Sequence, residues 1–160
     1  MTKTDYQFAD FLMAVSDSNK DFVTQIHEML TQDGYKIKIE PKANGFLVSY
    51  AHPKNKRSIL NFVFRKNGMY IRLYGENCNK YADILNRLPD SMVKQIEKSG
   101  VCKRLTDPQA CNPRCPMGYD FFIGETHFQK CRLVCFLLLV DGESAPLLLE
   151  MVGREKDERG

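Results

Sequence analysis

The sequence predicts an α+β fold in which helices cover an antiparallel sheet. Apolar residues repeat with helical spacing near both ends of the chain and at every second position between residues 35 and 74. The 160 residues are 43% hydrophobic and 27% charged, which is typical of a globular chain. We expect a four-stranded meander plus a C-terminal hairpin, with a cysteine-rich metal-binding loop.

Two helices are predicted at the start of the chain. The first covers residues 4–15, where apolar residues recur at positions i, i+3, i+4 and i+7. The second begins after Ser18, an N-cap residue that Asp21 follows three positions later, and ends at Gly34. Its inner face consists of Phe22, Val23, Ile26, Met29 and Leu30.

Four strands follow, because the spacing of apolar residues changes to two. They cover residues 35–40, 46–50, 58–65 and 69–74. Asn67 and Gly68 separate the last two, and both residues tolerate the positive φ angles of a tight hairpin turn. The pattern therefore predicts an antiparallel meander.

The rest of the chain returns to mixed structure. Helices are predicted over residues 81–88, from Pro89 to Gly100, and from Ser144 to Val152, and a frayed charged tail over 153–160. Strands over 119–123 and 128–140 form the predicted hairpin. We expect one domain over 1–160, with helices and sheet in 1–100, a cysteine-rich segment in 101–140 and a helix in 141–153.

Cellular location decides how the six cysteines are interpreted. Residues 1–10 are polar rather than signal-like, and the longest apolar run, residues 133–140, is far too short to span a membrane. We therefore expect a cytoplasmic protein without a membrane partner, in which thiols stay reduced. The net charge of +3 is too small to indicate nucleic acid by itself.

Five cysteines fall within 34 positions, with the spacing Cys-x8-Cys-x3-Cys-x15-Cys-x3-Cys. In a reducing compartment such clustering favours a metal over disulfides, and four thiolates suit tetrahedral zinc. The predicted ligands are Cys102, Cys111, Cys115 and Cys131. Cys135 is the reserve, expected on the same strand face as Cys131, and His127 is a further substitute.

Other interpretations of these cysteines stay open. The run from Cys111 to Pro116 is similar to the end of a ferredoxin motif, so an iron–sulfur cluster is one alternative. A thiol- or metal-dependent enzyme or redox sensor that uses Cys135 or Cys78 is another. The five thiols could also bind no metal at all.

Residues 98–152 carry a resemblance. The segment contains Gly100-Val-Cys102, Asp107-Pro, Cys111-Asn-Pro-Arg-Cys115, Gly118-Tyr119, Phe121 and Lys130-Cys131-Arg132. With these residues the chain resembles a family of uncharacterised bacterial proteins, a domain of unknown function. The resemblance implies a bacterial protein with a cysteine-rich C-terminal half, and it implies no activity.

No motif for nucleotide binding, metalloprotease or serine hydrolase chemistry is present, which favours a protein that is not an enzyme without deciding the matter. The preferred hypothesis is a zinc-stabilised binding or regulatory module for a small ligand, a protein or a nucleic acid. Tyr70, Arg72 and Tyr74 share one strand face and are the candidate ligand-binding residues, with Phe62 and Phe64 nearby. The basic turn over 53–57 could contact phosphate.

Overall fold

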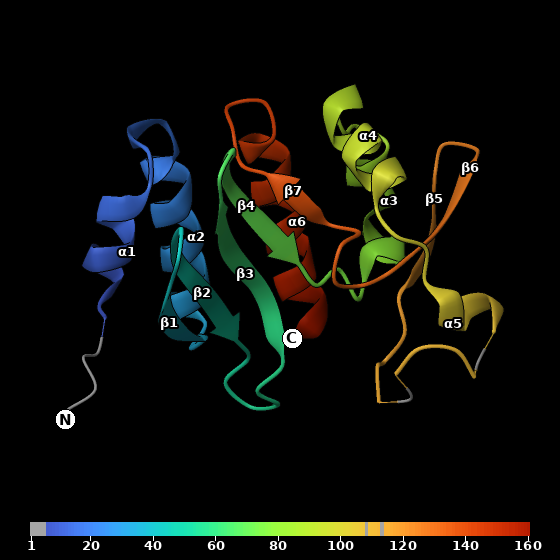
Figure 1. Cartoon of the computed structure of the whole chain (residues 1–160), viewed down its shortest axis with the longest axis horizontal. Coiled ribbons are helices and arrows are strands. Elements are labelled where there is room, and N and C mark those ends of the chain that lie inside the picture. Colours follow the sequence, from blue (N-terminus) through green and yellow to red (C-terminus); the bar gives the residue numbers. More distant parts are fainter. Residues whose placement is uncertain (1–5, 108, 113) are drawn as a thin grey trace.

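The computed structural model describes residues 6–107, 109–112 and 114–160 (Figure 1). The chain forms a five-stranded sheet and a separate two-stranded hairpin. Helices precede the sheet, connect it to the hairpin and end the chain. The predicted α+β class with an antiparallel sheet is confirmed. Within the described residues, no helix combines the length and apolar character needed to cross a bilayer.

The main sheet has the strand order β1-β2-β3-β4-β7, and every neighbouring pair is antiparallel. The first four strands are the predicted meander, with a tight hairpin after β3 in which Arg65 pairs with Gly68. Gly68 has a φ of +136°, a conformation that few other residues adopt. The strands are β1 (Lys36–Lys42), β2 (Gly45–Ala51), β3 (Ser58–Arg65), β4 (Gly68–Leu73) and β7 (Leu137–Leu139).

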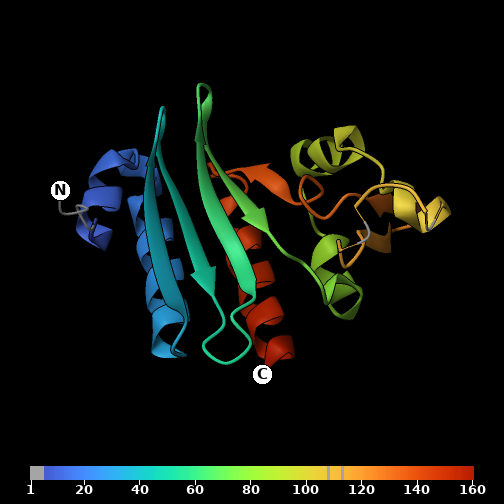
Figure 2. The same cartoon turned by 60° about the horizontal axis from the view of Figure 1, so that its bottom comes forward.

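One face of this sheet forms the core. Val48, Phe62, Ile71 and Leu138 pair in a row across four strands, and all four are fully buried. Three helices cover this face, α1 (Phe8–Ala14), α2 (Lys20–Gln32) and α6 (Ala145–Arg159) (Figures 1 and 2). Aromatic contacts anchor them, as where the rings of Phe11 and Phe62 lie 5.5 Å apart.

The predicted strand over residues 128–140 is wrong. β5 (Tyr119–Ile123) and β6 (Thr126–Lys130) form the predicted hairpin, but the chain then turns and returns to the main sheet as β7. In the turn, the backbone N–H of Cys135 donates to the carbonyl of Cys131 at 2.9 Å. The split has a physical reason: β7 pairs the backbone of β4, whose edge groups would otherwise lack partners.

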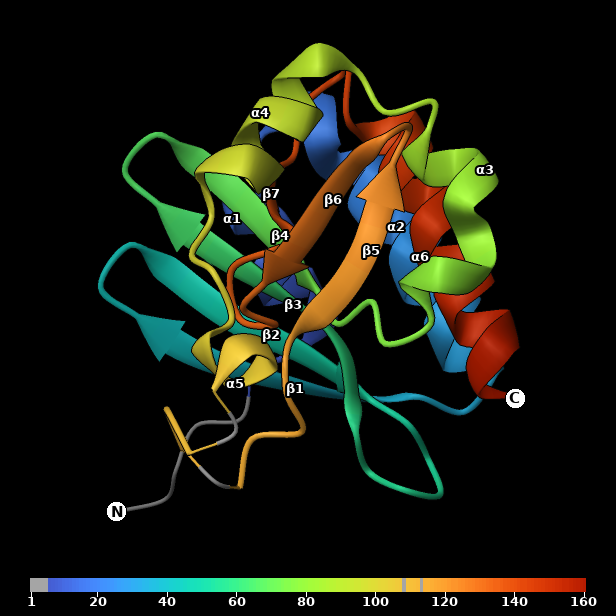
Figure 3. The same ribbon diagram turned by 90° about the vertical axis from the view of Figure 1, so that its right-hand side faces the viewer.

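Short helices connect the sheet to the hairpin. They are η2 (Cys78–Tyr81), α3 (Ala82–Leu85), α4 (Asp90–Lys98) and α5 (Lys103–Thr106), and they lie around β5 and β6 (Figure 3). Pro89 caps α4 as predicted. At the start of the chain α1 begins at Phe8, a 3-10 turn η1 (Asp17–Asn19) precedes α2, and residues 4 and 5 of the predicted first helix lie outside the described residues.

The last helix is longer than the sequence predicted. α6 continues through Gly153 to Arg159, so the expected frayed tail over 153–160 is wrong. Met151, Val152 and Glu155 are fully buried, because the helix packs along α2 and β3. Burial of one face therefore stabilises a segment whose composition alone resembles a solvated terminus.

Candidate functional site

The cysteines of the C-terminal half differ in exposure. Cys102 is buried, Cys115 and Cys131 are half-buried, and Cys111 is exposed with a positive φ of 64°. All of them have free thiols. Within the described part of the chain, no group of three or more histidine, cysteine or acidic side chains lies close enough to hold a metal. Binding by the four predicted ligands would therefore require these side chains to rearrange.

Two of the predicted ligands flank one short backbone junction. The N–H of Cys102 donates to the carbonyl of Gln129 at 3.1 Å, and the N–H of Cys131 donates to the carbonyl of Gly100 at 2.8 Å. The loop that follows Cys115 reaches the same place, where the N–H of Gly118 donates to Sγ of Cys102 at 3.2 Å. The main chains at Cys102, Gly118 and Cys131 thus meet around this junction, with Cys115 three residues before Gly118.

Gly118 fits this junction because it has no side chain. A Cβ at this position would lie 2.1 Å from the carbonyl oxygen of Lys130 and 2.8 Å from Cβ of Cys102. We expect Gly118→Ala to lower the free energy of unfolding by about 1–3 kcal/mol, because backbone must shift to relieve the overlap. Gly142→Ala is the matched control, since a Cβ there meets nothing within 4 Å. Urea denaturation of both variants measures the difference, and equal stabilities would contradict the junction geometry.

Cys135 and Cys78 belong to the core. Cys135 lies in the turn between β6 and β7 instead of on a strand, so the prediction that it shares a strand face with Cys131 is wrong. It is fully buried and Cys78 is 2% exposed. Burial raises the pKa of Cys78 to about 12 and places that of Cys135 well above its usual value. A reactive thiol needs the opposite change, a lowered pKa that favours the thiolate.

The burial of Cys78 and Cys135 predicts that both thiols are alkylated slowly. Iodoacetamide at neutral pH should leave Cys78 and Cys135 unmodified in the native protein, because neither is accessible or ionised. The urea-unfolded chain should label at all six cysteines, which serves as the control. Mass spectrometry of the peptides measures both states, and rapid native labelling of either residue would favour the redox-sensor alternative.

His127 has partners outside the cysteine-rich junction. Its ring stacks on Phe122 with centroids 4.6 Å apart, and its Nε2 hydrogen-bonds to Oδ1 of Asp120. That hydrogen bond is the main reason why the pKa of the Asp120 carboxyl lies below its usual value. His127 therefore lies on the outer face of the hairpin in contact with a carboxylate.

Of the three candidate ligand-binding residues, Tyr74 lines the pocket described next, whereas Tyr70 and Arg72 do not. Tyr70 and Arg72 lie on the sheet face opposite the core, and the Nε of Arg72 donates to the carbonyl of Leu133 at 2.8 Å. Tyr74 lies just beyond β4 and lines a pocket. Phe62 and Phe64 pair with Ile71 and Met69 on the core face, so they do not extend the surface of Tyr70 and Arg72.

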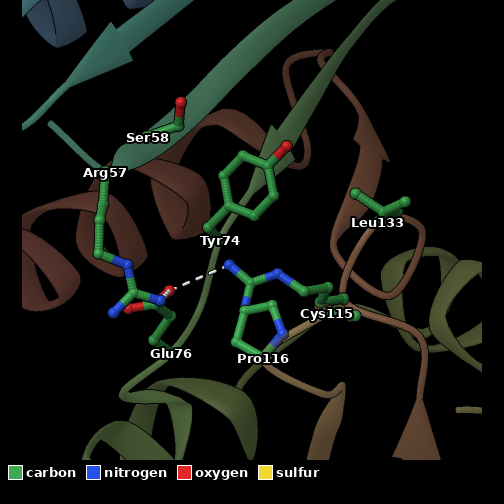
Figure 4. A pocket seen from close by; sticks show the side chains of 8 residues that line it. Arg57, Ser58, Tyr74, Glu76, Cys115, Pro116 and Leu133 are labelled. Atoms are coloured by element: carbon green, nitrogen blue, oxygen red, sulfur yellow. Dashed lines mark hydrogen bonds and ion pairs between the residues drawn. The ribbon is translucent and has the colours of Figure 1, made fainter. Parts of the chain in front are cut away.

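A pocket of about 360 Å³ lies where the main sheet meets the cysteine-rich segment (Figure 4). We call it the interface pocket. Residues at the start of β3 and just after β4 form one side. The loop before β5 and the turn after β6 form the other. Its lining consists of Arg57, Ser58, Tyr74, Glu76, Cys115, Pro116, Arg132 and Leu133.

Two arginines share one carboxylate in this pocket. Oε1 of Glu76 accepts hydrogen bonds from Nη2 of Arg57 and, at 3.0 Å, from Nη2 of Arg132. The guanidinium of Arg132 also lies 5.3 Å from the centre of the Tyr74 ring. Glu76 thus links the turn before β3 to the chain that follows β6.

A buried ion pair on α6 holds the backbone of residues that line the pocket. The carboxylate of Glu155 accepts hydrogen bonds from Tyr81, from the backbone and side chain of Asn77, and from Nε of Arg159, all at 2.8–2.9 Å. Arg159 also donates to the carbonyls of Ser58 and Tyr74 at 3.0 and 2.8 Å. This network fixes the backbone on both sides of Glu76.

Sequence reasoning missed most of these residues. The sequence indicates Arg57 as part of a basic turn, Tyr74 as a candidate and Arg132 as a basic residue beside the cysteines, but it does not predict a role for Glu76, Glu155 or Arg159. The spacing of Glu155 and Arg159, four positions apart, is the signal that could have indicated a paired helical face.

Comparison of the chain with family models, with curated proteins and with solved structures finds no match. The resemblance to a bacterial domain of unknown function therefore stays a prediction.

Proposed function

We propose that the protein is a zinc-stabilised binding module whose ligand occupies the interface pocket. The observation that carries the proposal is that the two walls of this pocket come from different parts of the chain, the end of the main sheet and the cysteine-rich segment. A concave site between two such parts, with apolar walls and a few polar groups, is the usual form of a ligand site.

The cysteine-rich segment is the part that zinc would stabilise. Between α5 and β5 the loop contributes few buried residues, and its backbone partners are mainly local turns and the junction around Cys102. In our proposal Cys102, Cys111, Cys115 and Cys131 bind zinc and so hold Cys115 and Pro116 at the pocket wall. Zinc in such a site supplies folding free energy rather than chemistry.

A thermal-shift screen against small-molecule panels tests the binding function. We expect compounds that raise the unfolding temperature of the wild type and fail to do so for Leu133→Lys. Leu133 lines the pocket and is 50% exposed, so the substitution changes the pocket without removing core packing. The proposal is wrong if no compound stabilises the wild type, or if every hit stabilises Leu133→Lys equally.

The two alternatives from the sequence lead to different measurements. An iron–sulfur protein would be brown and would contain iron and sulfide. A redox sensor would need a thiol other than Cys78 and Cys135, whose burial opposes ionisation. The pocket requires neither chemistry, and this is why the binding module is preferred.

A further inference from the structure

We infer that the interface pocket recognises a small molecule that carries one carboxylate or phosphate group on an apolar body, with Arg57, Arg132 and the Tyr119 hydroxyl as its donors. The inference rests on the proposed binding function and adds the chemical class of the ligand. Three independent features of the pocket support it: its charge, an unpartnered hydroxyl group and its apolar wall.

The charge of the pocket favours an anion. Arg159 is paired with the fully buried Glu155, so the groups that face the pocket are Arg57, Arg132 and the single carboxylate of Glu76. Together these three side chains carry one net positive charge. Lys103, Arg104 and Arg114 of the cysteine-rich segment would partly offset the negative charge of a zinc centre held by four thiolates. An anionic ligand would neutralise the positive charge of the pocket, and guanidinium groups suit carboxylates and phosphates because their N–H groups lie in one plane.

Both guanidinium groups keep free donors. Among the described residues, the side chains of Arg57 and Arg132 hydrogen-bond to Glu76 alone, and each does so through Nη2. A guanidinium has five N–H donors, so several on each arginine remain for a ligand. Arg57 is half exposed and Arg132 is 13% exposed, so solvent reaches the site.

The pocket continues into a second hollow of about 310 Å³ that shares Arg57, Glu76, Pro116 and Arg132 with it and adds Tyr119. Tyr119 is 6% exposed, and its buried hydroxyl has no hydrogen-bond partner among the described residues. A buried polar group without a partner is costly and points to a missing ligand or water. Burial raises the pKa of Tyr119, so the hydroxyl stays protonated and can donate to an anion.

The remaining wall is apolar. The rings of Tyr74 and Pro116 and the exposed side chain of Leu133 also line the interface pocket (Figure 4). These groups offer no charge to a ligand, and they suit an aromatic or aliphatic body attached to the anionic group.

Titration of the folded protein with benzoate, phenyl phosphate, inorganic phosphate and benzyl alcohol, followed by amide NMR shifts, tests the inference. We expect benzoate or phenyl phosphate to bind at least about tenfold more tightly than benzyl alcohol, since charge-assisted hydrogen bonds are lost without the anion. If inorganic phosphate binds as tightly as phenyl phosphate, the apolar wall does not contribute to recognition and the apolar body of the inferred ligand is wrong.

Two variants locate the donors. Arg57→Gln and Tyr119→Phe should each weaken binding of the better anion about tenfold. Tyr119→Phe removes a hydroxyl that has no partner, so folding should be unaffected. Tyr35→Phe is its matched control, because Tyr35 is 5% exposed and its hydroxyl also lacks a partner, but it does not line the pocket. Unchanged binding in both Arg57→Gln and Tyr119→Phe would overturn the assignment.

The outcomes separate the inference from the proposed function. If benzyl alcohol binds as tightly as the anions, and Leu133→Lys abolishes its binding, the pocket is a ligand site and the anionic class is wrong. If no probe binds and the thermal-shift screen also finds no ligand, the binding function fails and the inference fails with it.

Discussion

Replacement of Arg159 by leucine should lower the free energy of unfolding by about 3–5 kcal/mol. Arg159 is 5% exposed and pairs with Glu155, whose side chain is fully buried. Removing one member of a buried ion pair leaves the other charge without its partner in a medium that solvates it poorly. The substitution also removes the donors to the carbonyls of Ser58 and Tyr74. Urea denaturation monitored by circular dichroism gives the difference.

Arg154→Leu is the matched control for this prediction. Arg154 lies on the same helix, but it pairs with Asp83 at the surface, where the two side chains are 37% and 63% exposed. Exposed ion pairs contribute little, so the control should lose about 1 kcal/mol or less. If the two variants are equally stable, the buried network does not hold α6 against the sheet.

If zinc binds as proposed, its removal should unfold the cysteine-rich segment. After a strong chelator, we expect amide hydrogen exchange over residues 101–135 to accelerate by several orders of magnitude, because structural zinc contributes about 10–16 kcal/mol in small zinc domains. Amides of β3 should stay protected, since its buried residues Leu60 and Phe62 pack between helices and neighbouring strands. Ligand binding at the interface pocket should be lost at the same time.

Single substitutions provide the control for zinc removal. Cys102→Ala should lose the metal and raise exchange in the segment as the chelator does. Cys78→Ala should keep the metal, because Cys78 is also buried but lies outside the predicted ligand set. Retention of full metal content by Cys102→Ala would contradict the ligand assignment.

Local sequence patterns predicted the parts of the fold that depend on near neighbours. The alternation of residues 35–74 and the Asn67-Gly68 turn predicted the meander, because side-chain spacing and turn chemistry are local properties. They could not predict that residues 137–139 pair with β4, since that contact joins segments more than 60 positions apart. The run from Leu133 to Val140 is apolar throughout and gives no sign of the turn within it.

The candidate site was less predictable because its residues are scattered. Glu76, Arg132 and Arg159 look like ordinary surface charges in the sequence, and only the folded chain brings them together. Glu155 lies in a segment of charged residues, and nothing local distinguishes it from Glu158, which remains accessible. The cysteine spacing indicated which segment is unusual, whereas the pocket emerged only from tertiary contacts.

Elemental analysis of the purified protein, with metal counted per chain, is the most direct test of the central claim that zinc organises the cysteine-rich segment. The account predicts a colourless sample with about one zinc per chain, bound through thiolates. A folded protein that contains no metal, and whose exposed and half-buried thiols all react freely with a thiol reagent, would contradict it.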